Sequence, residues 1–155
     1  VVAGWENYDT TGKQGILSRV LEDGTIEIIV TAAGDFSTIT FESGEQTVKS
    51  KEVPTGNALH HTLGNLTRVA FNNAADLAAF VANHADESVT LRCGNTKTFT
   101  LNDKQKKMIA DTYAFSQIQG QINELDKRLS VINNKLQFYQ NKLEEAQSIE
   151  PQNNK

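Results

Sequence analysis

In the last third of the chain, apolar residues recur at alternating steps of three and four. The two resulting series are Phe115, Ile122, Leu129, Leu136 and Leu143, and Ile118, Leu125, Ile132, Tyr139 and Ala146. Taken as positions a and d of a heptad, these residues fill both positions through about four and a half heptads without a charge. An apolar stripe that repeats every 3.5 residues has to be buried against another helix, so the pattern predicts a coiled coil.

The residues beside this stripe indicate an apolar face wider than two helices bury, which fits three or more helices or a partner that lies in the groove. Leucine and isoleucine are mixed across a and d, without the β-branched a and leucine d that favour two strands. Val131 and Phe138 fall at position c, which a two-stranded coil leaves in water. The g positions are basic and the facing e positions neutral, so no ion pair fixes a parallel or antiparallel orientation. The predicted oligomer interface comprises Phe115, Ile118, Ile122, Leu125, Leu129, Val131, Ile132, Leu136, Phe138, Tyr139 and Leu143.

The helix that carries the stripe is expected to begin before the coil does. Asn102 is suited to cap it, with Gln105 as the second member of a capping box. Asp111 occupies what would be a d position, and the apolar face around it is wider than a coiled-coil stripe. We therefore expect a helix over 102–149 whose first turns pack against the preceding domain, a coil from about Phe115, and a disordered tail over 150–155.

Residues 1–101 read as an antiparallel β-rich head. Asp23-Gly24 predicts a hairpin over 15–30 with a two-residue loop, which pairs Leu21 with Ile26 and Leu17 with Val30. The meander is expected to continue with strands over 36–41 and 46–53, the last an exposed edge that carries Lys49 and Lys51.

A second hairpin is predicted over 88–101, around Gly94. A three-residue loop, 94–96, places Leu91 opposite Phe99 and Val89 opposite Leu101, which puts both apolar pairs on one face.

The remaining parts of the head are less regular. Asn73 is expected to cap a short helix over 74–84. The leucines of 55–71 have helical spacing, which Gly64 weakens, and residues 1–14 suggest an irregular arm pinned by Trp5 and Tyr8. The predicted fold class is therefore α+β, an antiparallel β-rich head with one or two short helices followed by a long C-terminal coiled-coil helix.

Charge and composition exclude several classes of function. The net charge is −4, with 12 acidic and 7 basic residues in 1–101 and 7 acidic and 8 basic residues in 102–155. Neither part has the basic density that nucleic-acid binding requires, so no nucleic-acid partner is expected. No run of about 18 apolar residues is present, so we expect no membrane span.

Candidate catalytic and metal-binding residues are few. His60, His61, His84 and Cys93 are the soft metal ligands, but they do not follow the spacing of a zinc site, and no metal or cofactor is expected. Cys93 alternates with Val89 and Leu91 and is expected in the core. Because no phosphate-binding glycine loop or nucleophile elbow occurs, we expect no enzyme activity.

These features together predict a non-enzymatic structural or assembly protein. The coiled coil would hold together several copies, or bind partner helices, and display the head in a virion, appendage or envelope assembly. The alternative is an exported soluble binding protein or inhibitor whose head binds a ligand and whose helix only dimerises. The chain begins at Val1 without a methionine, which favours a processed form and an extracytoplasmic or virion-associated location.

Overall fold

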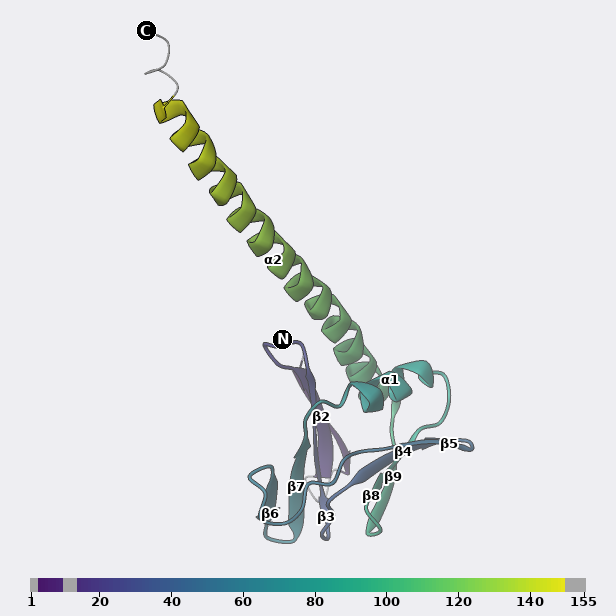
Figure 1. The fold of residues 1–155 in the computed structure, drawn as a ribbon. Coiled ribbons are helices and arrows are strands. Elements are labelled where there is room, and N and C mark those ends of the chain that lie inside the picture. Colours follow the sequence, from purple (N-terminus) through teal and green to yellow (C-terminus); the bar gives the residue numbers. More distant parts are fainter. Residues whose placement is uncertain (1–2, 10–13, 150–155) are drawn as a thin grey trace. The chain divides into compact units, whose positions relative to one another are not determined.

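The computed structural model describes residues 3–9 and 14–149, and it confirms the predicted α+β class (Figure 1). The chain divides into a first unit, Val1–Gln119, and a second unit, Gly120–Lys155. The tail predicted over 150–155 lies outside the described residues.

The described residues form nine strands and two helices. The elements are β1 (Ala3–Asp9), β2 (Gln14–Val20), β3 (Ile26–Ala33), β4 (Ile39–Ser43), β5 (Gln46–Lys49), β6 (His60–Leu63), β7 (Leu66–Phe71), α1 (Ala75–Asn83), β8 (Thr90–Cys93), β9 (Lys97–Thr100) and α2 (Asp103–Ile149).

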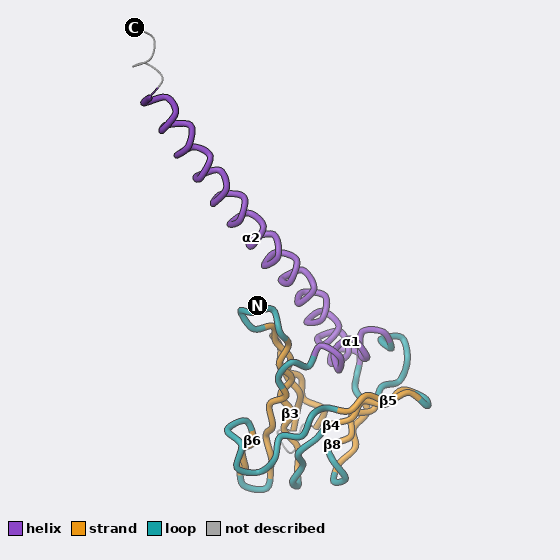
Figure 2. The backbone as a smooth tube through the Cα atoms, viewed as in Figure 1, coloured by secondary structure: helices purple, strands orange, loops and turns teal. Residues whose placement is uncertain are grey.

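The strands belong to two antiparallel sheets in the first unit (Figure 2). The first sheet has the order β1-β2-β3-β7-β6, and the second has the order β5-β4-β8-β9. The predicted continuous meander is wrong, because β3 and β4 lie in different sheets. Strand β3 is almost entirely buried and takes β7 as its second neighbour, with Ile28 opposite Phe71. Strand β4 pairs instead with β8, with Phe41 opposite Leu91.

The predicted register of the first hairpin is wrong by one residue. Val20, not Leu21, lies opposite Ile26, and Ile16 lies opposite Val30. Leu21 N donates to Thr25 O at 2.9 Å, which leaves a three-residue loop that ends at Gly24 with φ +86°. A three-residue loop with a left-handed glycine at its end is the next commonest hairpin connection after the two-residue loop.

The second hairpin has the predicted register. Leu91 lies opposite Phe99, and Leu101 N donates to Val89 O at 2.9 Å. Gly94, the first residue of the loop, adopts a left-handed φ of +53°, and Cys93 is fully buried on the inward face.

Two irregular predictions are replaced by strands. The arm expected over 1–14 is wrong for the described residues, because β1 pairs with β2 along Gly4–Asn7. The helical spacing within 55–71 is also misleading. It belongs to the β6–β7 hairpin, in which Leu63 lies opposite Leu66 and Gly64 begins the turn with φ +65°.

The predicted short helix is present as α1, but its cap is different. Ala74 is the N-cap residue and makes no side-chain capping bond, while Asn73 adopts a left-handed φ of +53°. In the second sheet, the predicted fourth strand ends at Lys49 rather than at residue 53, and it forms an exposed edge as expected.

The core of the first unit joins both sheets, α1 and the first turns of α2. Its largest fully buried side chains include Phe41, Phe71, Leu77, Leu91 and Ile109. The predicted capping box of α2 is confirmed, because Asn102 N donates to Gln105 Oε1 at 2.7 Å and Gln105 N donates to Asn102 Oδ1 at 2.8 Å.

Candidate oligomerisation interface

The apolar stripe of α2 lies almost entirely on the surface of the single chain. Ten of the eleven predicted interface residues are between 45% and 64% exposed, from Ile122 to Tyr139 at the extremes. The eleventh, Phe115, is half-buried in the first unit, to which Ile118 also belongs. The ten exposed residues are Ile118, Ile122, Leu125, Leu129, Val131, Ile132, Leu136, Phe138, Tyr139 and Leu143.

Helical geometry aligns these side chains. From Ile122 to Leu143 the helix rises by about 32 Å, and residues three and four apart stand above one another on the same face. Monomeric soluble proteins rarely expose a contiguous apolar surface of this extent. The stripe therefore has the character of an interface.

Polar side chains on the flank of the stripe are paired within the helix. Arg128 Nε lies 3.4 Å from Glu124 Oε1, and Lys142 Nζ lies 3.9 Å from Glu145 Oε2. Lys142 Nζ also lies 5.7 Å from the centre of the Phe138 ring. Its aliphatic stem thereby accompanies Phe138, as long basic side chains commonly do beside apolar surface.

Position c contributes a second apolar strip beside the first. Val131 and Phe138 are 53% and 56% exposed, as open as the a and d residues themselves. A shallow groove of about 370 Å³ runs between Val131 and Ile132 and is bordered by Arg128. The exposed apolar face is consequently wider than the stripe that a two-stranded coil buries.

The four soft metal ligands do not converge. Among the residues that the structure describes, no three histidine, cysteine, aspartate or glutamate side chains are arranged to hold a metal ion. His84 Nδ1 lies 2.7 Å from Phe80 O, and His61 is exposed on β6. Cys93 is enclosed in the core, where burial raises the pKa of its thiol to about 12.

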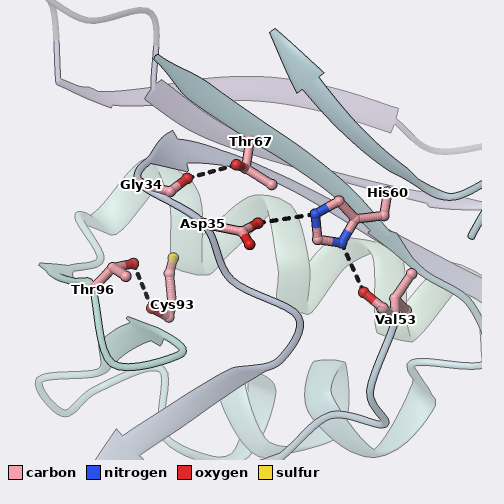
Figure 3. Close-up of polar contacts among 7 residues, drawn as sticks. All are labelled: Gly34, Asp35, Val53, His60, Thr67, Cys93 and Thr96. Carbon is pink, nitrogen blue, oxygen red and sulfur yellow. Dashed lines mark hydrogen bonds and ion pairs between the residues drawn. The ribbon is translucent and has the colours of Figure 1, made fainter. Parts of the chain in front are cut away.

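His60 has a structural environment instead (Figure 3). Its Nδ1 lies 2.8 Å from Val53 O and its Nε2 lies 3.1 Å from Asp35 Oδ1, while only 1% of its side chain is exposed. Both partners are acceptors, so the ring donates to both only when it carries two protons. The contact with Asp35 connects β6 to the segment between β3 and β4, and the contact with Val53 connects it to the segment between β5 and β6.

Sequence reasoning missed a groove on the outer face of the first sheet. The groove has a volume of about 340 Å³, and its lining includes Arg19, Glu27, Ile29, Arg68 and Ala70. The available signal was Ile29 itself, a large apolar residue on the face of β3 that also carries Glu27 and Thr31.

No family property can be transferred to this chain. In comparisons with protein-family models, curated proteins and solved structures, nothing matches it. Among the helices of the described residues, none is long and apolar enough to cross a membrane.

Proposed function

We propose that this chain is a non-enzymatic assembly protein that associates with further copies of itself through a coiled coil formed by α2. The observation that carries the proposal is the exposure of the a and d residues between Ile122 and Leu143 in the single chain. Burying each leucine or isoleucine contributes on the order of 1.5–3 kcal/mol, so covering this face is strongly favourable.

A second copy is the occupant that the pattern fits best. In a parallel coil of identical chains, each layer contains the same a or d residue from every copy. Because these residues are apolar, no layer contains a charge or an amide. The basic g positions, at Arg128 and Lys135, face neutral side chains at e, so copies meet no like charge there. The proposed interface therefore does not need a different protein that would supply acidic side chains to pair with these basic ones.

The width of the apolar face favours three or more helices. Two parallel helices cover a and d but leave c in water, and Val131 and Phe138 would stay exposed. A third helix covers more of the surface beside the stripe. We propose an oligomer of at least three copies, in which the first units are carried together.

A charge placed in the middle of the stripe tests the proposal. Leu129→Asp alters a side chain that is 56% exposed in the single chain, so the chain itself loses little. In an assembly the same change buries an unpaired carboxylate at a cost of several kcal/mol. Sedimentation velocity at micromolar concentration should show oligomers for the unchanged protein and monomers for the variant.

Asp126→Ala is the matched control, because Asp126 is exposed at position e of the same stretch. It should keep the mass of the unchanged protein. A monomeric unchanged protein, or an oligomer that survives Leu129→Asp, would overturn the proposal.

A further inference from the structure

The groove of the first unit follows three neighbouring rows of cross-strand pairs on the outer face of the first sheet. Its floor includes Ile29 and Ala70, which are partners across β3 and β7, and Leu17 continues the same apolar row on β2. The row on one side carries Arg19 opposite Glu27. The row on the other side carries Arg68, with His61 opposite it on β6.

The Arg19 side of the groove is electrostatically complete. Arg19 Nη2 and Nε each lie 2.7 Å from Glu27 Oε1, and only 8% of the Glu27 side chain is exposed. A buried carboxylate with a guanidinium this close has its charge compensated. This side has no remaining need for a charged ligand.

The Arg68 side is not complete. Among the side chains that the structure describes, which do not include that of Asp9, no carboxylate forms an ion pair with Arg68. Its guanidinium carbon lies 5.9 Å from the centre of the Trp5 ring. Trp5 is itself fixed, because its Nε1 donates to Asn7 Oδ1 at 2.8 Å. The indole also lies over Gly15, where a Cβ atom would be only 2.6 Å from it. Within the described part of the chain, Arg68 is thus a cation without a carboxylate partner, beside the apolar floor of the groove.

We propose that this groove binds an amphipathic monoanion, with a carboxylate on Arg68 and an aliphatic body along Ile29 and Ala70. Guanidinium and carboxylate match in a two-pronged geometry, and the single uncompensated cation sets the ligand charge at one. The far end of the floor is apolar as well, since Leu59 and the half-exposed Leu63 also line the groove. Its volume is at the lower end of the usual range of about 300–1,000 Å³ for ligand sites, which fits a short chain.

Octanoate is the probe for the test, with acetate as the head group alone and 1-octanol as the tail alone. Titration calorimetry on the full chain should detect octanoate, and neither control should bind within tenfold of it. Trp5 is the one tryptophan of the sequence and neighbours Arg68, so its fluorescence should change as octanoate binds.

Arg68→Gln should weaken octanoate binding at least tenfold while leaving the melting temperature close to that of the unchanged protein, since Arg68 is exposed. The matched control is Arg92→Gln, an arginine of the second sheet that pairs with Glu42 and should leave octanoate binding unchanged. Ala70→Phe fills the floor and should weaken octanoate binding even though Arg68 is present.

Three results would overturn the inference. They are equal binding of octanoate and 1-octanol, unchanged octanoate binding in Arg68→Gln, and no octanoate binding by the unchanged protein. Leu129→Asp should bind octanoate normally, so failure of the groove and failure of the coil are distinguishable. If that variant still associates and Ala70→Phe abolishes the association, the occupant of the groove is a second copy, and the monoanion is excluded.

Discussion

Two stretches of the same helix contrast with each other. Between Gln105 and Ser116, α2 buries polar side chains: Gln105 and Thr112 are fully buried, and Ser116 is 8% exposed. Between Ile122 and Leu143, it exposes about half of every large apolar side chain. The first stretch thus buries polar side chains beside the core residue Ile109, whereas the second leaves its apolar side chains exposed.

The first stretch can bury polar groups because the first unit supplies partners for them. Ser18 and Thr112 hydroxyls lie 2.7 Å apart, and Ser116 Oγ donates to Gly24 O at 2.6 Å. Lys106 Nζ donates to Glu87 O at 2.9 Å. Buried polar groups are tolerated when they are hydrogen-bonded, and most of those in this stretch find their partners within one chain. The exception among the described residues is Gln105 Nε2, which is buried without a hydrogen-bond partner.

The second stretch has no such complement in the single chain. Its exposed residues repeat with the period of a coiled coil, and the free energy of covering them is available only to a partner. One helix can therefore be a core element at one end and a candidate interface at the other. Buried polar side chains mark the first stretch, and exposed apolar side chains mark the second.

The largest expected effect is on the reactivity of the Cys93 thiol, which tests whether the core of the first unit excludes solvent. Burial raises the pKa of Cys93 from its ordinary value of 9.0 to about 12, so its thiolate at pH 8 should be about a thousandfold scarcer than in an unfolded chain. Labelling by a thiol reagent should accordingly be at least a thousandfold slower in buffer than in denaturant. Rapid labelling in buffer would show that the second hairpin opens or is misaligned.

The same thiol makes stability depend on pH in a defined window. Its pKa is raised on folding, so its contribution is fully present below pH 9 and is lost as pH rises towards 12. Urea unfolding at several pH values should show a steeper loss for the unchanged protein than for Cys93→Ala.

An intermediate effect tests the width of the interface. Changing Val131 to Ser and Phe138 to Gln together should lower the stability of the oligomer by about 2–4 kcal/mol, because a buried phenylalanine contributes on the order of 2–3 kcal/mol and a valine less. The measurement is a thermal melt at matched protein concentration. A change below about 0.5 kcal/mol would mean that both side chains remain in water, as in a two-stranded coil.

The smallest effect concerns the start of α2. Asn102→Ala removes one reciprocal bond of the capping box and should cost about 1 kcal/mol in the free energy of unfolding of the first unit. Gln117→Ala, an exposed change on the same helix, is the control and should cost less than about 0.5 kcal/mol. Equal effects of the two changes would show that the cap does not hold the helix start in place.

The two hairpins show what the sequence could and could not predict. In the second hairpin, only one register puts Val89 and Leu91 opposite apolar partners, so the apolar pattern predicted the register correctly. In the first, each strand carries large apolar residues on both faces, so a shift of one residue still places apolar side chains opposite one another. The bond from Thr25 N to Asp23 Oδ1 at 3.0 Å, a local alternative to the two-residue turn, was the missing information.

Of the two candidate sites, the sequence predicted the stripe of α2 but not the groove of the first sheet. Periodicity alone was enough to place the stripe on one helix face, because helix geometry is local. The groove depends on β7 lying beside β3, a pairing that joins residues as far apart as Thr31 and Arg68. No local pattern encodes such a neighbour, and Arg68 in sequence is one exposed arginine among others.

The strand order has a consequence for the timing of folding. The central pairs, β3 with β7 and β4 with β8, close loops of several tens of residues, and such distant pairings form slowly. The core also needs Ile109, so neither sheet is sealed until the chain has been made beyond that residue. During synthesis the exposed apolar stripe of α2, from Ile122 to Leu143, is made after all of these segments. Vectorial synthesis therefore gives the first unit an interval in which to close before the stripe that we propose as the interface between copies has been made.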